Sequence, residues 1–223
     1  MWRPGPARTG HDDMTIRRGE DWGARGPLAK GAPLVRTDAE VVPAIDRQRI
    51  GDPPEVGLLG GDLHRTLGSP VHSEAELRSG EAMRLPIDLV EVILHTPDGQ
   101  TIEERFCAHL VATAGDGRLF ETQTYVAMNG SFIADANVGP RAHPNDGLVD
   151  ITSGVLARRD RRAARRRLST GTHLPHPDLD TARVRSDSVS FDRVRRVSLD
   201  GREPFDAVGL ALECIPDALV VVA

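Results

Sequence analysis

The chain has 223 residues, of which 39% are hydrophobic and 4% aromatic, and its formal net charge is -5. This length is enough for one medium-sized domain or two small ones, each with a hydrophobic core. We expect a soluble cytoplasmic protein, because no apolar run reaches the roughly 20 residues of a membrane-spanning helix and no secretory signal is visible. The few aromatic residues argue against nucleic acid as a partner, since base stacking requires them.

The first third of the sequence contains three segments of different character. Residues 1–33 are rich in glycine, proline, arginine and aspartate without apolar periodicity, which predicts a mobile N-terminal arm. Thr37 and Glu40 form a capping-box pattern, which predicts a helix from there to about Arg49. A second capping box at Ser73 and Glu76 predicts another helix that continues to about residue 84.

Between these helices lies a glycine-rich turn. An apolar run at 56–59 predicts a short buried strand, which leads through Gly60 and Gly61 to Asp62 and a short helix over 63–67. A glycine turn between a strand and a helix is typical of phosphate-binding sites in α/β folds. The alternative is a helix start capped by Asp62 without a ligand.

The remainder of the chain has the pattern of antiparallel strands. Turn sequences at 97–99 and 115–117 separate apolar runs, as in hairpins. The expected strands are 87–94, 102–113, 119–129, 148–151, 182–185, 188–191, 194–199, 208–214 and 218–222. We therefore expect an α+β protein in which a reduced α/β lobe at 34–85 packs on a larger antiparallel β domain at 86–223.

One predicted helix, Arg158–Arg167, interrupts these strands and carries seven arginines. Its charge favours contact with anionic lipid headgroups by about 1 kcal/mol per basic residue, so we expect a peripheral membrane partner. The alternatives are a solvated basic face and nucleic acid. Shortly after this helix, His173 and His176 have the spacing of a metal-binding pair, but prolines at 175 and 177 break the helix that would align them.

A turn at 140–150, PRAHPNDGLVD, contains a candidate cation site. The Asp146 carboxylate and the carbonyls of His143 and Leu148 could provide oxygen ligands, while Gly147 permits a positive φ. The alternative is an ordinary turn carboxylate.

Three segments together resemble the diacylglycerol kinase and sphingosine kinase family of lipid kinases, whose fold is shared with NAD kinase. They are PNDGLVDI at 144–151, VGLLGGDLHRTLG at 56–68 and VSLDGREP at 197–204. The resemblance implies a nucleotide lobe followed by a β domain whose last strand returns to the first lobe. It also implies ATP as cofactor, contacted by Asp38, Gly60, Gly61 and Asp62, and a structural Mg²⁺ held by His143, Asp146 and Leu148.

The sequence departs from this family where ATP would bind. The glycines of the family's phosphate loop are absent from VRTDAE at 35–40, and fewer residues precede this segment than the family's nucleotide lobe requires. Arg202 stands at the place of the family's catalytic glutamate, which leaves Glu203, one residue later, as the candidate base. Two functions therefore remain: ATP-dependent phosphorylation of a lipid hydroxyl, or a non-catalytic homologue that binds lipid or protein. A homo-oligomer or a partner chain could complete the nucleotide lobe.

Overall fold

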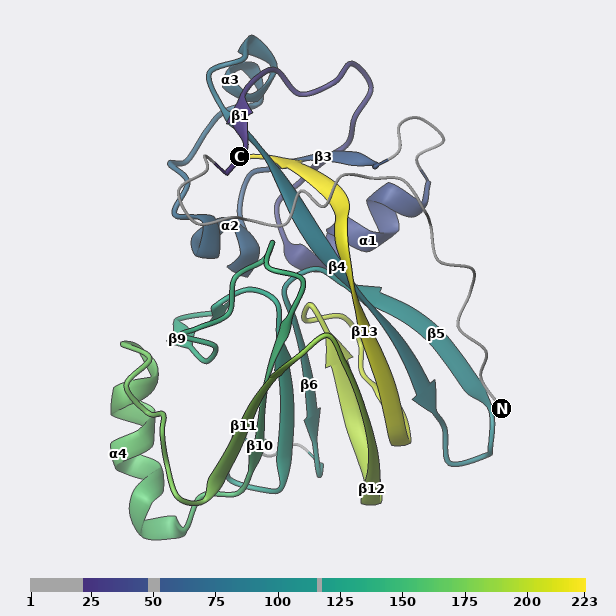
Figure 1. Ribbon diagram of the computed structural model, residues 1–223, viewed down its shortest axis with the longest axis vertical. Coiled ribbons are helices and arrows are strands. Elements are labelled where there is room, and N and C mark those ends of the chain that lie inside the picture. Colours follow the sequence, from purple (N-terminus) through teal and green to yellow (C-terminus); the bar gives the residue numbers. More distant parts are fainter. Residues whose placement is uncertain (1–21, 48–52, 116–117) are drawn as a thin grey trace.

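A computed structural model describes residues 22–47, 53–115 and 118–223 (Figure 1). Among these residues, eleven strands form one sheet, in which β1, β4, β13, β12, β6, β7, β10 and β11 follow one another and β2, β3 and β5 are attached to this path. The strands of the sheet are β1 (Ala24–Arg25), β2 (Leu34–Val35), β3 (Glu55–Leu58), β4 (Met83–His95), β5 (Thr101–Phe106), β6 (His109–Thr113), β7 (Thr124–Met128), β10 (Val149–Gly154), β11 (Leu179–Val184), β12 (Ser186–Leu199) and β13 (Phe205–Val222). A separate hairpin is formed by β8 (Phe132–Ile133) and β9 (Ala136–Asn137).

In the described part of the chain, four helices accompany the sheet: α1 (Asp38–Asp46), α2 (Asp62–Leu67), α3 (Glu74–Ser79) and α4 (Arg158–Leu168). The first three lie at one end of the molecule with β1 and β3, whereas α4 lies at the other end beside β10 and β11 (Figure 1). The helix predicted to reach residue 84 ends at Ser79, because Gly80 has a φ of 96° and the chain enters β4 at Met83. None of the helices within the described residues has the length and apolar character of a membrane-spanning segment.

Two long strands, β4 and β13, connect the two ends of the molecule. They pair antiparallel over most of their length, with a register shift between Ile215 and Leu219. Beyond this shift β13 also pairs in parallel with β3, and β3 pairs in parallel with β2. The end of the chain therefore belongs to the small α/β part, and the runs predicted as separate strands at 208–214 and 218–222 are one strand.

The antiparallel part is curled around a common core. Val90, Phe106, Tyr125, Ile151 and Leu210, which come from five different strands, belong to one buried apolar cluster. The strand expected at 102–113 is broken at Cys107 and Ala108, because their N–H groups bind the Asp200 carboxylate instead of a neighbouring strand. A second cluster surrounds β3 and the ends of β4 and β13.

The described part of the predicted arm, residues 22–33, is packed against the fold. The indole N–H of Trp22 donates to the carbonyl of Pro86 at 3.2 Å, and β1 pairs antiparallel with β4. Leu28 is buried against Leu77 and Val222. Two apolar anchors in a polar segment are too sparse to produce a periodic signal, so composition alone gave a misleading expectation here. The rest of the predicted arm lies outside the described residues, as do residues 48–52 after the first helix.

Candidate functional site

The Gly60-Gly61 turn leads into α2, and the first two backbone amides of that helix are bound by a side-chain carboxyl group of the chain itself. Asp38, the first residue of α1, is only 4% exposed. Its side-chain oxygens accept the N–H groups of Asp62 at 2.5 Å and Leu63 at 3.1 Å. The position that a phosphate would take at a helix start is thus filled by Asp38.

A second carboxylate binds the segment just before α1, which the resemblance aligns with the family's phosphate loop. Glu40 accepts the N–H groups of Arg36 at 2.7 Å and Thr37 at 3.2 Å, which completes the predicted capping box. These hydrogen bonds, with the Arg36 N–H first, hold the pKa of Glu40 below its usual value. Backbone amides just before α1 and at the start of α2 are therefore already hydrogen-bonded to side-chain carboxyl groups.

Gly61 is required by the contact with Asp38. Its φ of 101° and ψ of 177° are accessible to glycine alone, and an added Cβ would lie 2.6 Å from an Asp38 oxygen. We expect Gly61→Ala to lower the free energy of unfolding by about 2–4 kcal/mol. Gly68→Ala is the matched control, because its φ of 64° is left-handed but nothing lies within 4 Å of an added Cβ. It should cost about 1 kcal/mol in urea unfolding; equal costs would contradict this role for Asp38.

Asp200 brings the β12–β13 turn to the same place. Its carboxylate accepts three backbone N–H groups, from Cys107 at 2.9 Å, Ala108 at 2.9 Å and His109 at 3.0 Å. Burial, and then the nearby charge of Asp200, raise the pKa of Asp38 to about 7. Asp38 is therefore a carboxyl group that titrates near neutral pH.

His109 is a functional candidate that sequence reasoning missed. It is 5% exposed, and its Nδ1 lies 3.8 Å from an Asp62 carboxylate oxygen. Within the described residues this nitrogen has no hydrogen-bond partner. The only signal in the sequence was a histidine inside an apolar run, which is more often a core residue. The structure thus brings Asp38, Asp62, Asp200 and His109 together where α2 meets the β domain.

The predicted catalytic base, Glu203, is exposed on the turn that begins at Asp200. Its neighbour Arg202 is directed to β5, where it donates to a Glu104 carboxylate oxygen at 2.8 Å and to the carbonyl of Arg105. Arg202, which the resemblance aligns with the family's glutamate, is therefore a cation held in an ion pair.

The predicted cation turn has its charges balanced by arginine. One Asp146 oxygen accepts the N–H of Leu148 at 3.0 Å, and the other is paired with Arg183. Arg183 also lies 3.3 Å from Asp150, which in turn is 3.6 Å from Arg141. Since two carboxylates face two guanidinium groups, the residues present do not fit the Mg²⁺ site that the resemblance implies.

The remaining predicted ligand, His143, belongs to the packing of this turn. Its ring lies 4.6 Å from the Trp22 ring, and its Nδ1 accepts the N–H of Asn145 at 3.2 Å.

Asp88, which is fully buried on β4, accepts the N–H groups of Gly147 at 2.7 Å and Asp217 at 3.0 Å. Burial raises the pKa of Asp88 to about 6. Its position inside the apolar run of β4 was the signal that could have identified it.

A curled antiparallel β domain that shares its last strand with a small α/β lobe defines a protein of the NAD kinase fold class. Residues 105–223, more than half of the chain, match the family described as the YegS C-terminal NAD kinase beta sandwich-like domain. The chain therefore belongs to this family, and the predicted fold class and the resemblance to diacylglycerol kinase-like proteins are confirmed.

Solved structures share the fold at low sequence identity. A Bacillus anthracis str. Sterne protein assigned as a diacylglycerol kinase matches with a TM-score of 0.60 and 16% identity, over 85% of this chain and 76% of its own. Another diacylglycerol kinase structure from that strain gives a TM-score of 0.56 and 15% identity, over 85% and 75% of the two chains. Yeast NADH kinase complexed with NADH gives 0.51 and 13%, over 85% and 60%. No curated protein matches the sequence.

Proposed function

We propose that this chain is a non-catalytic member of the diacylglycerol kinase-like family that binds anionic lipid surfaces through its β domain. One observation carries the first half of this proposal: Asp38 and Glu40 occupy backbone amides in both turns where phosphates would bind. Phosphoryl transfer depends on donors and cations that position a triphosphate. Two carboxyl groups already accept the hydrogen bonds that those donors would give to a phosphate, and glycine is absent where close backbone approach is needed.

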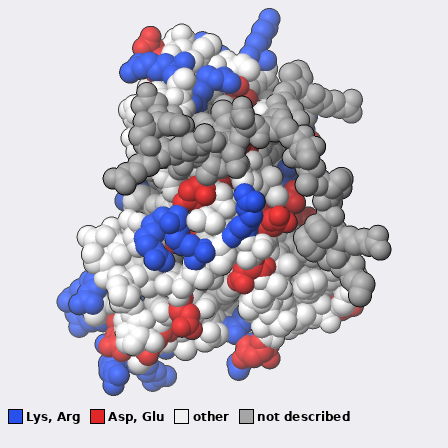
Figure 2. All heavy atoms as spheres, in the orientation of Figure 1, with Lys and Arg blue, Asp and Glu red and all other residues white. Residues whose placement is uncertain are grey.

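The proposed lipid contact is the outer face of α4. Arg161 donates to the carbonyls of Leu156 at 3.0 Å and Glu121 at 2.7 Å, and Arg165 pairs with the Glu121 carboxylate, so these two attach the helix to the fold. Ala164 is the buried residue of the helix. The arginines at 158, 162 and 166 are exposed and four residues apart, which places them on one face. Lys and Arg side chains project at the edge of the molecule where α4 lies (Figures 1 and 2).

Replacing these three arginines together by glutamate should abolish binding to anionic vesicles. At about 1 kcal/mol per basic residue near the surface, loss of three charges weakens binding by roughly 100-fold, and reversal weakens it further. The measurement is flotation with vesicles of phosphatidylcholine containing or lacking 30% phosphatidylserine. A matched triple substitution to glutamate at the exposed residues Lys30, Arg36 and Arg47, on the other lobe, should bind as the unmodified chain does. Equal loss in both triple variants, or in neither, would refute the assignment of α4.

The second candidate is an active lipid kinase. It is favoured by the meeting of Asp38, Asp62, Asp200 and His109 at the junction of the two lobes, since clustered carboxylates and a histidine are groups that proton transfer uses. The same vesicles, supplied with diacylglycerol, Mg²⁺ and ATP labelled at its γ-phosphate, distinguish the two. Lipid-soluble label that increases with protein concentration supports the kinase; vesicle binding without such label supports the non-catalytic protein.

A further inference from the structure

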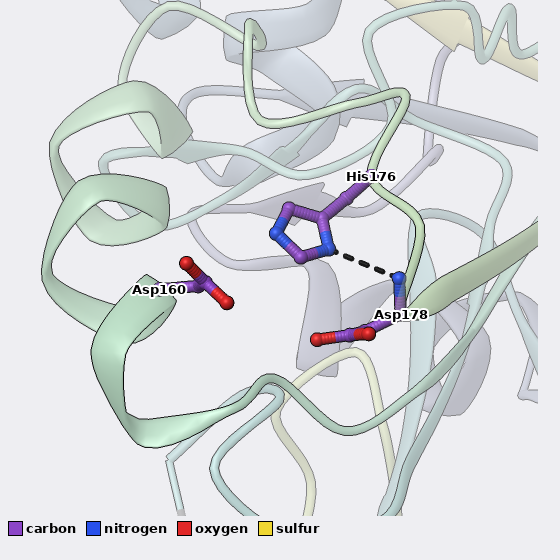
Figure 3. A group of neighbouring side chains, drawn as sticks. All are labelled: Asp160, His176 and Asp178. Carbon is purple, nitrogen blue, oxygen red and sulfur yellow. Dashed lines mark hydrogen bonds between the residues drawn. The ribbon is translucent and has the colours of Figure 1, made fainter.

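Asp160, His176 and Asp178 form a group of potential metal-ligating side chains beside the first turn of α4 (Figure 3). One potential ligand atom from each residue lies within 4.8 Å of the others. Asp160 is the third residue of α4, and the other two come from the turn before β11. We propose that these three residues bind a divalent transition cation of the Zn²⁺ class.

The backbone holds two of the three ligands in place. His176 and Leu179 form an isolated β-bridge, and the N–H of Leu179 donates to the carbonyl of His176 at 3.1 Å. The side chain of Leu179 is buried in the cluster beneath α4, which anchors the turn. An Asp178 oxygen lies 3.4 Å from the N–H of Ala157, the residue before α4, so the turn and the helix start are adjacent. The three side chains are therefore already close together, and a cation would replace the hydrogen bonds that His176 Nδ1 and an Asp178 oxygen accept from the backbone.

The imidazole presents a nitrogen that can act as a ligand. His176 Nδ1 accepts the N–H of Asp178 at 3.1 Å, so in the neutral ring Nδ1 carries the lone pair and Nε2 the proton. A cation at Nδ1 replaces this one hydrogen bond and requires no proton to leave the neutral ring. In Figure 3 the ring and both carboxylates border a common space.

The donor set selects the class of metal. One imidazole nitrogen with two carboxylates suits Zn²⁺ and its neighbours, whereas Mg²⁺ and Ca²⁺ prefer oxygen ligands alone. Arg159, which lies 3.3 Å from Asp160, is 87% exposed, so its weak ion pair competes little with a metal. The pair suggested by sequence spacing is not used, because His173 is buried near Phe120. In the proposed site, Asp160 and Asp178 accompany His176 in place of His173.

The proposal is tested by calorimetric titration of Zn²⁺ into the full chain without a polyhistidine tag. We expect one Zn²⁺ per chain with a Kd of about 10 μM or lower, and a Kd at least ~50-fold higher in His176→Ala, since even loss of an outer partner costs 10–100-fold. Asp160→Asn should weaken binding by at least ~10-fold while leaving the turn intact. His95→Ala, at an exposed histidine on β4, is the matched control and should bind Zn²⁺ unchanged.

Two further measurements separate metal binding from a structural effect. Urea unfolding without metal should show His176→Ala folded, and Co²⁺ should give visible absorption bands that this variant lacks. A hundredfold excess of Mg²⁺ should not displace Zn²⁺. The proposal is overturned if no Zn²⁺ binds at about 100 μM, or if His176→Ala and His95→Ala bind it equally. Either result leaves the lipid-binding proposal standing, because that proposal rests on the arginine face of α4.

Discussion

Asp200→Ala is expected to lower the free energy of unfolding by about 3–5 kcal/mol, the largest single effect predicted for this chain. The substitution leaves three buried backbone N–H groups, those of Cys107, Ala108 and His109, without their acceptor. Each unsatisfied donor costs about 1–3 kcal/mol, with partial relief where water enters. Domains of this size are stable by about 5–15 kcal/mol, so the variant should unfold at much lower urea.

Two companion variants identify the cause. Asp200 has a φ of 52°, which asparagine tolerates better than alanine, and an asparagine oxygen can still accept some of the three N–H groups. Asp200→Asn should therefore cost less, about 1–2 kcal/mol. Asp206→Ala, at an exposed position on β13, should change stability by less than about 0.5 kcal/mol. An Asp200→Ala chain as stable as Asp206→Ala would show that the turn is not held as described.

Asp38→Asn is expected to change how stability depends on pH. Burial and the Asp200 charge raise the pKa of Asp38 from 3.8 to about 7 in the folded chain. The folded state then holds a proton that the unfolded state has released, so this group's stabilisation is complete below pH 3.8 and is lost as pH rises to about 7. Between pH 5 and pH 8 the free energy of unfolding therefore falls by about 2–3 kcal/mol on account of this group. The Asp38→Asn variant does not show this fall, because asparagine does not titrate.

The measurement is urea unfolding of both proteins at pH 5 and pH 8. Relative to the unmodified chain, Asp38→Asn should gain about 2–3 kcal/mol on going from the lower to the higher pH. Comparing the two proteins cancels other groups, such as His173, whose burial lowers its pKa to about 4 and which acts in the opposite direction. A stability difference that is the same at both pH values would mean that Asp38 is ionised throughout this range.

Features set by neighbouring residues could be predicted from the sequence. Thr37 and Glu40 form the predicted capping box, and Gly147 has a φ of 70° within the turn at 144–151, as its predicted positive φ requires. Each depends on residue types within a few positions, and the three segments sufficed to identify the family. The β-domain fold was predicted from that resemblance, because local sequence patterns do not determine the order of strands in a sheet.

Contacts between distant segments could not be predicted. Asp200 binds N–H groups 91 to 93 positions earlier, and Asp88 binds that of Gly147, 59 positions later. Arg183 neutralises Asp146 from 37 positions away, so a turn that looks like a cation site in isolation is an ion pair in the fold. Asp38 similarly reaches α2 from α1. Asp38 and Asp146 were candidate ligands in the sequence, whereas their partners in the fold could not be seen there.

Nucleotide binding tests the central claim most directly. The measurement is calorimetric titration of ATP with Mg²⁺ into the full chain, together with thermal unfolding at 1 mM nucleotide. Because Asp38 and Glu40 already occupy the backbone amides, we predict no saturable heat and no shift in Tm. A site with a Kd near 10 μM would instead stabilise the folded state by about 2.7 kcal/mol at this concentration. Stabilisation of that size, lost in Gly61→Ala but kept in Gly68→Ala, would contradict the account and identify a working nucleotide site.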